Sequence, residues 1–283
     1  MKRIRAIPRT AIRPADAHKG TAGLVLIVAG SRGMAGAAAL AGNAALRGGA
    51  GLVKIATADR ALDTVATLAP CCTTAPLPDD GTSITREAAE VVLRLAAGQH
   101  VVAIGPGLGQ TDGVAGVVMA ALAHVAAPVV LDADGLNVLG KHAASVFKGD
   151  RSPVIITPHP GEAARLLGIT SKEVQADREA AALRLAGLGA AVAVLKGAGT
   201  VVTDGERMYV NTTGNPGMAT GGAGDVLTGL LAALVAGGMP AFDAAVLAVW
   251  AHGRAGDLAA ERRGLLGLTA LDILNCVPDA LKV

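Results

Sequence analysis

Hydrophobic residues recur along the chain in short runs, and each run is followed by a longer segment in which they recur at helical spacing. Short apolar runs bounded by glycine or proline are typical of strands that a parallel sheet buries on both faces. Asp204 and Gly205 are expected to form the turn of a hairpin. The predicted strands cover residues 24–29, 52–56, 100–104, 128–131, 153–156 and 191–195, with the hairpin at 200–203 and 207–211.

The intervening segments predict helices and, with the strands, a fold class. Residues 70–85 carry prolines and polar residues, so we expect a connection there that includes at most a short edge strand. Alternating strands and helices indicate an α/β protein: a three-layer, doubly wound, mostly parallel sheet with helices on both faces. No linker divides the chain, so a single domain over residues 1–283 is predicted. Helices are predicted near residues 37–46, 59–68, 86–97, 111–125, 162–167, 172–188, 225–237, 241–262 and 270–277.

The composition argues against nucleic-acid binding. With 283 residues, 52% of them hydrophobic and 17% charged, the chain has enough apolar material for one large core. Aromatic residues make up only 1%, which leaves too few side chains for a base-stacking platform. The net charge is +2, and the basic cluster from Lys2 to Arg13, in an N-terminal extension over residues 1–15, is expected to be a solvated tail.

Membrane insertion and secretion are not expected either. The longest uncharged stretch, residues 113–131, contains His124 and Pro128 and fits a helix followed by a strand better than a membrane span. The N-terminus lacks the apolar core of a signal peptide. The 3 cysteines, an adjacent pair and one distant residue, match no disulfide framework or metal-ligand spacing, which indicates a reducing cytoplasm.

A polar, Gly-rich segment over residues 211–225, NTTGNPGMATGGAGD, precedes a strongly hydrophobic helix. Such a segment brings free backbone N–H groups and the positive end of a helix dipole to one point, where an anion, above all phosphate, binds. Gly222 and Gly224 allow close approach of the backbone. Asp225 adds a carboxylate, which indicates a base for phosphoryl chemistry on a hydroxyl. The alternative is an ordinary first-turn acid of a capped core helix.

Further small, polar or charged motifs follow the predicted strands. Ligands of an open α/β sheet bind beyond the carboxyl ends of its strands, so these motifs predict one large site. One of them, GPGLGQ, lacks the last glycine of a dinucleotide-binding fingerprint, and we exclude that fingerprint. The motifs are GSRGMAG from Gly30, GPGLG from Gly105, DAD from Asp132, TPHPGE from Thr157 and KGAGT from Lys196.

Single residues within these motifs each allow two interpretations. His159, between two prolines, either points into the site or hydrogen-bonds to the nearby backbone. Asp132 and Asp134 either cap or shape the next element or hold Mg²⁺ through water, and a capping or shaping role is favoured for at least one of them. Lys196 either reaches a phosphate or is solvated.

Taken together, the motifs resemble the ADP-dependent NAD(P)H-hydrate dehydratase family of the ribokinase-like superfamily. The last motif alone indicates only the superfamily, whereas its combination with TPHPGE and the first loop is far more specific. The resemblance covers nearly the whole chain beyond the N-terminal extension. The matching segments are HKG from His18, GSRGMAGAAAL, AIGPGLG, VLDADGLNVL, TPHPGE, VLKGAGTVV and GNPGMATGGAGDVLTG.

The resemblance implies a metabolite-repair lyase that removes water from the S epimer of hydrated NADH or NADPH. ADP would be the co-substrate, converted to AMP and phosphate, with Mg²⁺ as cofactor and no metal-binding residue assigned. The residues implied are Ala37, Gly107, His159 and Asp225 for the hydrate, Lys196, Gly197, Ala198, Gly199, Thr200 and Gly224 for the nucleotide, and Asp225 with Gly222, Ala223 and Gly224 for catalysis. With the pKa of an exposed aspartate, Asp225 would be ionised at neutral pH and act more by position than by basicity.

The resemblance also implies a homotetramer. Since the chain begins close to its first strand, an NAD(P)H-hydrate epimerase acting on the same pool is expected to be a separate protein. The main alternative is an ATP-dependent kinase of the same superfamily that acts on a vitamin precursor such as a thiazole or pyrimidine alcohol. A nucleotide sensor without activity is a third possibility, but a carboxylate beside an anion site disfavours it.

Overall fold

The computed structural model describes residues 1–10, 13–140, 143–147 and 152–282. These residues form one ten-stranded sheet in the order β1-β10-β9-β8-β7-β6-β5-β2-β3-β4. Neighbouring strands from β4 to β8 are parallel, β9 is antiparallel to both of its neighbours, and β1 is parallel to β10. The strands are β1 (Lys2–Arg3), β2 (Leu24–Val28), β3 (Leu52–Ala58), β4 (Thr73–Leu77), β5 (Val101–Ile104), β6 (Val129–Leu131), β7 (Val154–Ile156), β8 (Val192–Leu195), β9 (Val201–Thr203) and β10 (Arg207–Val210).

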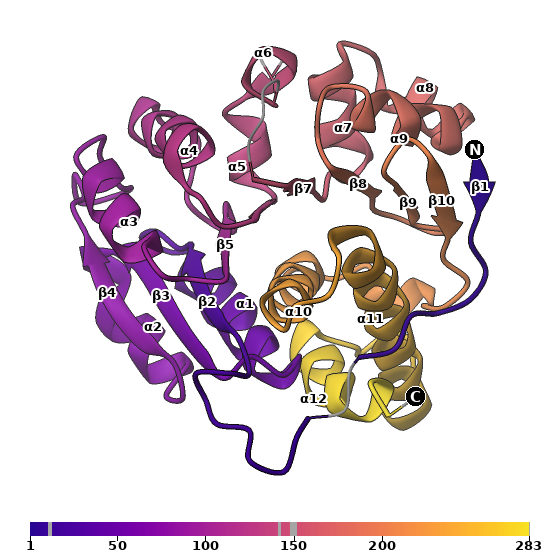
Figure 1. Ribbon diagram of the computed structural model, residues 1–283, viewed down its shortest axis with the longest axis horizontal. Coiled ribbons are helices and arrows are strands. Elements are labelled where there is room, and N and C mark those ends of the chain that lie inside the picture. The colour runs from indigo at the N-terminus through magenta and orange to yellow at the C-terminus, as the bar shows by residue number, and fades with distance from the viewer. Residues whose placement is uncertain (11–12, 141–142, 148–151, 283) are drawn as a thin grey trace.

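Helices cover both faces of the sheet, as predicted (Figure 1). One face packs against α1 (Ala35–Arg47), α2 (Leu62–Leu68), α10 (Ala223–Ala236), α11 (Ala241–Arg263) and α12 (Ala270–Ala280). The other face packs against α3 (Ala88–Ala96), α4 (Asp112–His124), α5 (Asp134–Asn137), α6 (Ala143–Phe147), α7 (Pro160–Leu167), α8 (Ser171–Ala176) and α9 (Arg178–Ala186). The α/β fold class read from the sequence is therefore confirmed.

The apolar runs form strands because both of their faces are buried. In β2, Val25 and Ile27 point into the core beneath α1 and α10, whereas Leu26 and Val28 point into the core beneath α3 and α4. All four side chains are fully buried. An alternation of polar and apolar residues would have exposed one face, so the continuous run is what this position in the sheet requires.

The N-terminal extension differs from the expected solvated tail. β1 pairs with β10 and becomes the edge strand of the sheet (Figure 1). The Arg3 guanidinium donates to the Glu179 carboxylate of α9 at 2.5 and 2.8 Å. Ile4 and Ile7 pack against the core, which a basic but partly apolar segment permits. Residues 11 and 12 of the extension lie outside the described part of the chain.

Two further predictions are refined. The connection over residues 70–85 does contain an edge strand, β4, which pairs with β3. The single helix predicted over 172–188 is wrong, because α8 ends before Asp177 and α9 begins after it. The Asp177 carboxylate accepts the Ala180 N–H at 2.9 Å and caps the new helix.

Candidate active site at the carboxyl edge of the sheet

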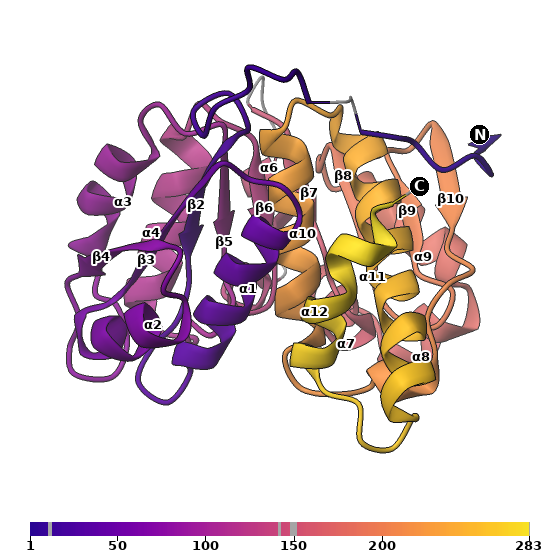
Figure 2. The same cartoon turned by 90° about the horizontal axis from the view of Figure 1, so that it is seen from below.

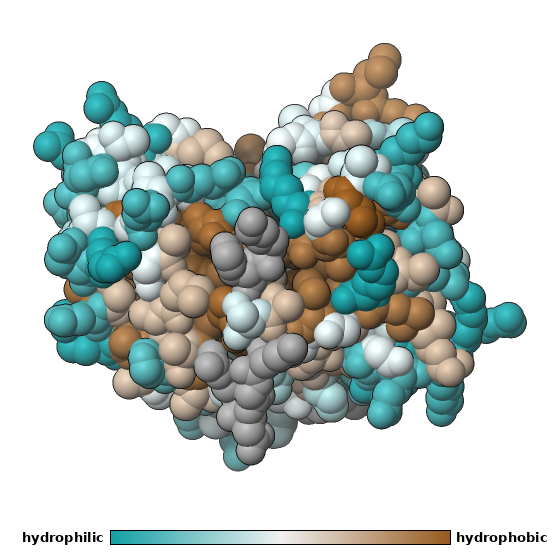
Figure 3. Space-filling model, turned by 90° about the horizontal axis from the view of Figure 1, so that it is seen from above, coloured by the Kyte–Doolittle hydropathy of each residue, from teal (hydrophilic) through white to brown (hydrophobic). Residues whose placement is uncertain are grey.

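The motifs that follow the strands meet at one edge of the sheet, as predicted. β2, β5, β6, β7 and β8 are parallel neighbours, so the loops that follow them emerge side by side. The Gly-rich segment ahead of α10 lies at the same edge (Figure 2). In the space-filling view the molecule is hollowed between two lobes at this edge (Figure 3). The site is thus assembled from six loops that lie far apart in the sequence.

The N-terminus of α10 presents unpaired backbone donors. Gly222 precedes the helix with a φ of 88°, a left-handed conformation that favours glycine. The Ala223 N–H donates to the Thr220 carbonyl at 3.5 Å and the Val226 N–H to the Gly222 carbonyl at 3.2 Å. Within the described residues, the N–H groups of Gly224 and Asp225 have no acceptor, and no side chain caps the helix. Two free amides at the start of a 14-residue helix form an anion site.

Asp225 lies in the first turn of this helix and is partly buried. Burial raises the pKa of its carboxyl to about 7, with a further increase from the negative charges of Asp132 and Asp134 that outweighs the attraction of Lys196. The expectation that Asp225 is fully ionised at neutral pH is therefore wrong. A carboxylate that is half protonated near pH 7 is a stronger base than an exposed aspartate, which suits proton transfer.

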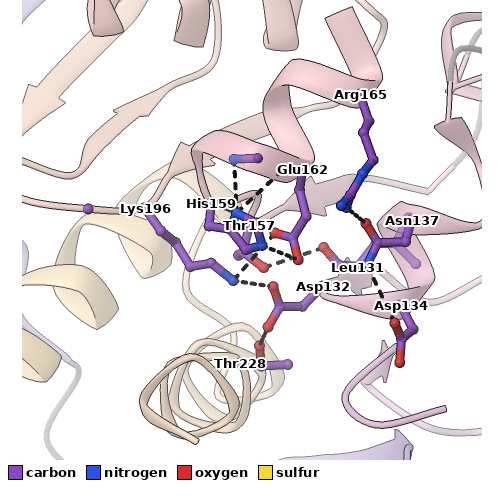
Figure 4. A network of polar contacts seen from close by, with 12 residues as sticks. Leu131, Asp132, Asp134, Asn137, Thr157, His159, Glu162, Arg165, Lys196 and Thr228 are labelled. Carbon is purple, nitrogen blue, oxygen red and sulfur yellow. Dashed lines mark hydrogen bonds and ion pairs between the residues drawn. The ribbon is translucent and has the colours of Figure 1, made fainter. Parts of the chain in front are cut away.

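An ion pair between Lys196 and the buried Asp132 lies beside α10, the helix that carries Thr228 (Figure 4). Lys196 Nζ is 2.5 Å from Asp132 Oδ1 and 3.9 Å from Glu162 Oε2. Asp132 is only 1% exposed, and its second oxygen accepts the Thr228 hydroxyl at 2.6 Å. Burial lowers the pKa of Lys196, but attraction to Asp132 and Glu162 outweighs burial and raises it. The lysine is thus charged and held in place, not solvated.

Lys196 also borders the anion site. A Cβ atom built on Gly224 would lie 3.5 Å from Lys196 Nζ and 3.9 Å from Asp132 Oδ2. The end of β8, the end of β6 and the start of α10 therefore meet at this glycine. An ammonium group at this position complements the two free amides and strengthens the attraction for a phosphate.

His159 forms the N-cap of α7, which confirms the interpretation that it hydrogen-bonds to nearby backbone. Its Nδ1 accepts the N–H groups of Gly161 at 2.9 Å and Glu162 at 3.3 Å. The Glu162 carboxylate accepts the His159 N–H at 2.7 Å, which completes a capping box. Burial, followed by the charges of Lys196 and Arg165, lowers the pKa of His159, so the ring is neutral at pH 7. Half of the side chain is exposed and faces the same edge.

Ala37 and Gly107 are neighbours, as their joint assignment to the hydrate requires. A Cβ atom built on Gly107 would lie 3.1 Å from the Ala37 Cβ, and Gly107 has a φ of 64°. Asp134 fixes this loop, because its carboxylate accepts the Gly109 N–H at 2.9 Å and the Gln110 side chain at 3.1 Å. The favoured shaping role is confirmed for Asp134.

The Lys196–Thr200 loop links β8 to β9 and is closed on itself. The Thr200 hydroxyl donates to the Gly197 carbonyl at 2.8 Å and accepts the Gly197 N–H at 3.2 Å. Gly197, Ala198 and Gly199 are exposed at the edge of the sheet. The loop therefore offers backbone groups to a ligand, whereas its only buried charge is Lys196.

The segment ahead of α10 is held against α11. The Asp257 carboxylate of α11 accepts the Gly214 N–H and the Asn215 side-chain N–H, both at 3.0 Å. The Thr213 hydroxyl donates to the Trp250 carbonyl at 2.8 Å. Gly253 of α11 lies beneath Thr213 so closely that an added Cβ would be 2.3 Å from the hydroxyl oxygen.

The substitution Gly253→Ala tests this packing. An added methyl group would force Thr213 to move and to break its hydrogen bond to the Trp250 carbonyl of α11. We therefore expect a loss of about 1–3 kcal/mol in the free energy of unfolding. Urea titration followed by circular dichroism measures it. Gly267→Ala is the control, since a Cβ at this position would meet nothing within 4 Å. Equal stability of the two variants would contradict the tight packing of the segment on α11.

Sequence reasoning missed several side chains that support the site. Glu162, Thr228, Arg178 and Asp257 hold the site residues or their loops. The capping-box pattern H-x-x-E, read as a variant of S/T-x-x-E, is a signal that would have found Glu162. The other three act across long sequence separations, and no local pattern marks them.

No described helix is both long enough and apolar enough to cross a membrane. Likewise, no group of three or more His, Cys, Asp or Glu side chains in the described ranges is arranged to hold a metal ion.

The fold and the site define a ribokinase-like α/β protein with an anion site and a base at the start of a helix. A family model described as NAD(P)H-hydrate dehydratase matches residues 25–279. The chain belongs to this family, which confirms the resemblance read from the motifs.

Comparisons with individual proteins agree with the family. The chain is 41% identical to the ADP-dependent (S)-NAD(P)H-hydrate dehydratase of Neisseria meningitidis over 92% of its own length and 86% of that protein. It is 44% identical over 95% of its length to the bifunctional NAD(P)H-hydrate repair enzyme Nnr of Moorella thermoacetica, of which it covers 51%. The chain thus spans about half the length of the first curated relatives that it matches.

Solved structures give the same picture. A Bacillus subtilis ADP/ATP-dependent NAD(P)H-hydrate dehydratase, co-crystallised with ATP and Mg²⁺, is 34% identical with a TM-score of 0.82, covering 96% of this chain and 94% of that one. A hydroxyethylthiazole kinase from Pyrococcus horikoshii is similar at 18% identity with a TM-score of 0.58, covering 93% and 89%. The latter similarity shows only that the fold is shared.

Proposed function

We propose that the protein dehydrates the S epimer of NADH or NADPH hydrate and uses ADP, which becomes AMP and phosphate. The observation that carries the proposal is Asp225: a partly buried carboxyl with a pKa of about 7, beside two free amides and a fixed lysine. A site that only binds phosphate gains nothing from a carboxylate there. A site that transfers a phosphoryl group to a hydroxyl needs one.

The residues at α10 divide the chemistry between them. Asp225 takes the proton from the ring hydroxyl of the hydrate while the hydroxyl oxygen attacks the terminal phosphorus of ADP and AMP leaves. The free amides of Gly224 and Asp225, with the turn from Gly222 through Ala223, stabilise charge on the phosphoryl oxygens. The ring nitrogen then expels phosphate, and loss of a proton from the adjacent carbon restores the double bond.

The binding residues are proposed in two groups. Ala37, Gly107, His159 and Asp225 contact the hydrate, supported by the contact between Ala37 and Gly107 across two loops. Lys196, Gly197, Ala198, Gly199, Thr200 and Gly224 contact the nucleotide, supported by the exposed glycine backbone of the loop and by the position of Gly224 beside Lys196 Nζ.

Mg²⁺ fits this site only as an ion that arrives with the nucleotide. The carboxylate oxygens of Asp132 and Asp134 are committed to Lys196, Thr228, Gly109 and Gln110. No described cluster of carboxylates or imidazoles forms a cage for a resident metal. Mg²⁺ commonly binds through substrate phosphates and retained waters, and we propose that mode here.

The assay follows the near-ultraviolet absorbance of the purified protein with NADPH hydrate, Mg²⁺ and either ADP or ATP. Recovery of the reduced nicotinamide band with ADP is the expected result. Recovery only with ATP would support the proposed dehydration but contradict ADP as the co-substrate. No recovery with either, together with ATP consumption on vitamin-precursor alcohols, would instead support the kinase, which at present rests on shared fold alone.

His159→Asn separates the capping role of His159 from substrate contact. Asparagine is itself a strong N-cap, so the stability should stay within about 0.5 kcal/mol of the parent, whereas His159→Ala should lose about 1 kcal/mol. Loss of the exposed ring should raise the KM for the hydrate about tenfold in both variants, roughly 1.4 kcal/mol. A normal KM for the asparagine variant would limit His159 to its structural role.

Two features of the assembly stay predictions. We propose a homotetramer and an NAD(P)H-hydrate epimerase that acts on the same pool, both by analogy with the family. Light scattering of the purified chain measures the first, and the rate of repair of mixed epimers with and without added epimerase tests the second.

A further inference from the structure

Arg178, the first residue of α9, inserts its guanidinium beneath the Lys196–Thr200 loop. Its Nη2 donates to the carbonyls of Leu195 at 2.9 Å and Lys196 at 3.2 Å, and Gly199 O lies at 3.5 Å. Its Nη1 donates to the Gln175 side chain at 2.7 Å, and this hydrogen bond fixes the guanidinium from the other side. One side chain therefore spans the start and the end of the loop.

The shape of the loop depends on this guanidinium. Gly197 has a φ of 133°, and a Cβ atom built there would lie 3.2 Å from Nη1 and 3.3 Å from Nη2 of Arg178. The loop's other hydrogen bonds join Gly197 to Thr200 and hold its two ends: the Lys196 N–H donates to the Pro158 carbonyl and the Thr200 carbonyl accepts the Asn211 N–H, both at 2.9 Å. The backbone at Gly197 thus adopts a conformation that favours glycine and passes unusually close to the arginine.

The positive charge of Arg178 is not neutralised by the part of the protein that the structure describes. No carboxylate in the described ranges lies within ion-pair distance of the guanidinium. Its Nε is buried without an acceptor. Burial lowers the pKa of Arg178, yet an arginine stays charged at any physiological pH. A half-buried cation whose described partners are all uncharged carries a desolvation cost that a nearby anion would offset.

We infer that Arg178 is a positioning residue that holds the Lys196–Thr200 loop in the shape that receives a nucleoside diphosphate. The inference rests on the proposed function, because it takes this loop as the nucleotide subsite. The guanidinium fixes the carbonyls of Leu195, Lys196 and Gly199, so the exposed backbone of residues 197–199 and the Lys196 ammonium keep a fixed arrangement for the phosphates. The uncompensated charge adds attraction for the same anion.

The test uses Arg178→Lys and Arg178→Gln in the full chain, with ADP binding measured by calorimetry without hydrate. A lysine ammonium keeps the charge but lacks the planar fork that reaches several carbonyls, so both variants should bind ADP about tenfold more weakly. Arg184→Gln on the same helix is the control and should bind ADP normally, since its hydrogen bond among the described residues goes to the Leu167 carbonyl at 3.5 Å and not to the Lys196–Thr200 loop.

Kinetics distinguish positioning of the nucleotide loop from a general loss of structure. The KM for ADP should rise about tenfold in both Arg178 variants while the KM for the hydrate stays unchanged. Wild-type ADP affinity in both variants, or an equal rise in both KM values, would overturn the inference. If the unmodified chain does not bind ADP, the proposed function is rejected, and the inference with it. If the unmodified chain binds ADP and only the variants behave differently from the expectation, the inference alone is rejected.

Discussion

Asp225→Asn is expected to abolish turnover and at the same time to stabilise the fold. Loss of the base should lower kcat by about 10²–10⁴-fold, while the asparagine keeps the size of the side chain and the binding of both substrates. Turnover of NADPH hydrate and calorimetric titration with ADP measure the two effects. Asp112→Asn, in the exposed first turn of α4, is the matched control and should remain active.

The stabilisation has a defined pH dependence. Folding raises the pKa of Asp225 from its usual range to about 7, so the folded protein holds this proton more tightly than the unfolded chain does. The free energy of unfolding therefore falls as the pH rises from about 4 to about 7. The asparagine variant has no carboxyl to deprotonate and does not lose this stability. The difference between its Tm and that of the parent should therefore be largest above pH 7 and vanish near pH 4.

The same pKa predicts the pH profile of the parent enzyme. Since the base must be deprotonated to act, kcat/KM should rise as the pH increases through about 7 and level off above it. A midpoint near pH 4 would mean that Asp225 is an ordinary exposed aspartate in solution. A variant at position 225 with near-normal rates would remove the proposed mechanism altogether.

Lys196→Met is expected to destabilise the fold strongly. Removal of the ammonium leaves the 1% exposed Asp132 carboxylate with the Thr228 hydroxyl as its one side-chain partner among the described residues and with no described cation at hydrogen-bonding distance. Breaking a buried pair on one side typically costs 3–5 kcal/mol, and about 3 kcal/mol is expected here. Urea unfolding measures the loss, with Lys172→Met on exposed α8 as the control.

A second readout links this pair to catalysis. Lys196 lowers the pKa of Asp225, so its loss should move the midpoint of the pH profile upward as well as slow the reaction. The double variant Lys196→Met, Asp132→Asn removes both charges and should recover much of the stability. Failure of the double variant to recover any stability would show that packing, not the unpaired charge, carries the effect.

Local patterns were sufficient to predict most of the fold. The strand runs and the turn at Asp204 and Gly205 lie where the structure places them, because each is decided by residues that are neighbours in the sequence. The break at Asp177 was missed although its signals were local: Asp177 and Thr170 are both N-caps.

The electrostatics of the site could not be predicted in the same way. The pKa of Asp225 depends on Asp132, Asp134 and Lys196, which come from different loops and meet only after the sheet has formed. The supports for the loops likewise come from remote elements, such as Arg178 beneath Gly197 and Asp257 beside Gly214. Motifs therefore indicated the candidate residues that the proposal assigns to the ligands, whereas most of the residues that hold these loops in place carry no local pattern.

The pairing of β1 with β10 also constrains the order of events during synthesis. Residues 2 and 3 leave the ribosome long before their partners at 207 and 208 exist, so this edge of the sheet can close only late. Bringing such distant segments together carries a large loop-closure cost that local hairpins avoid. The N-terminal residues thus add the last strand to a sheet whose other strands have already paired. A nascent chain halted before β10 should leave this segment open to protease.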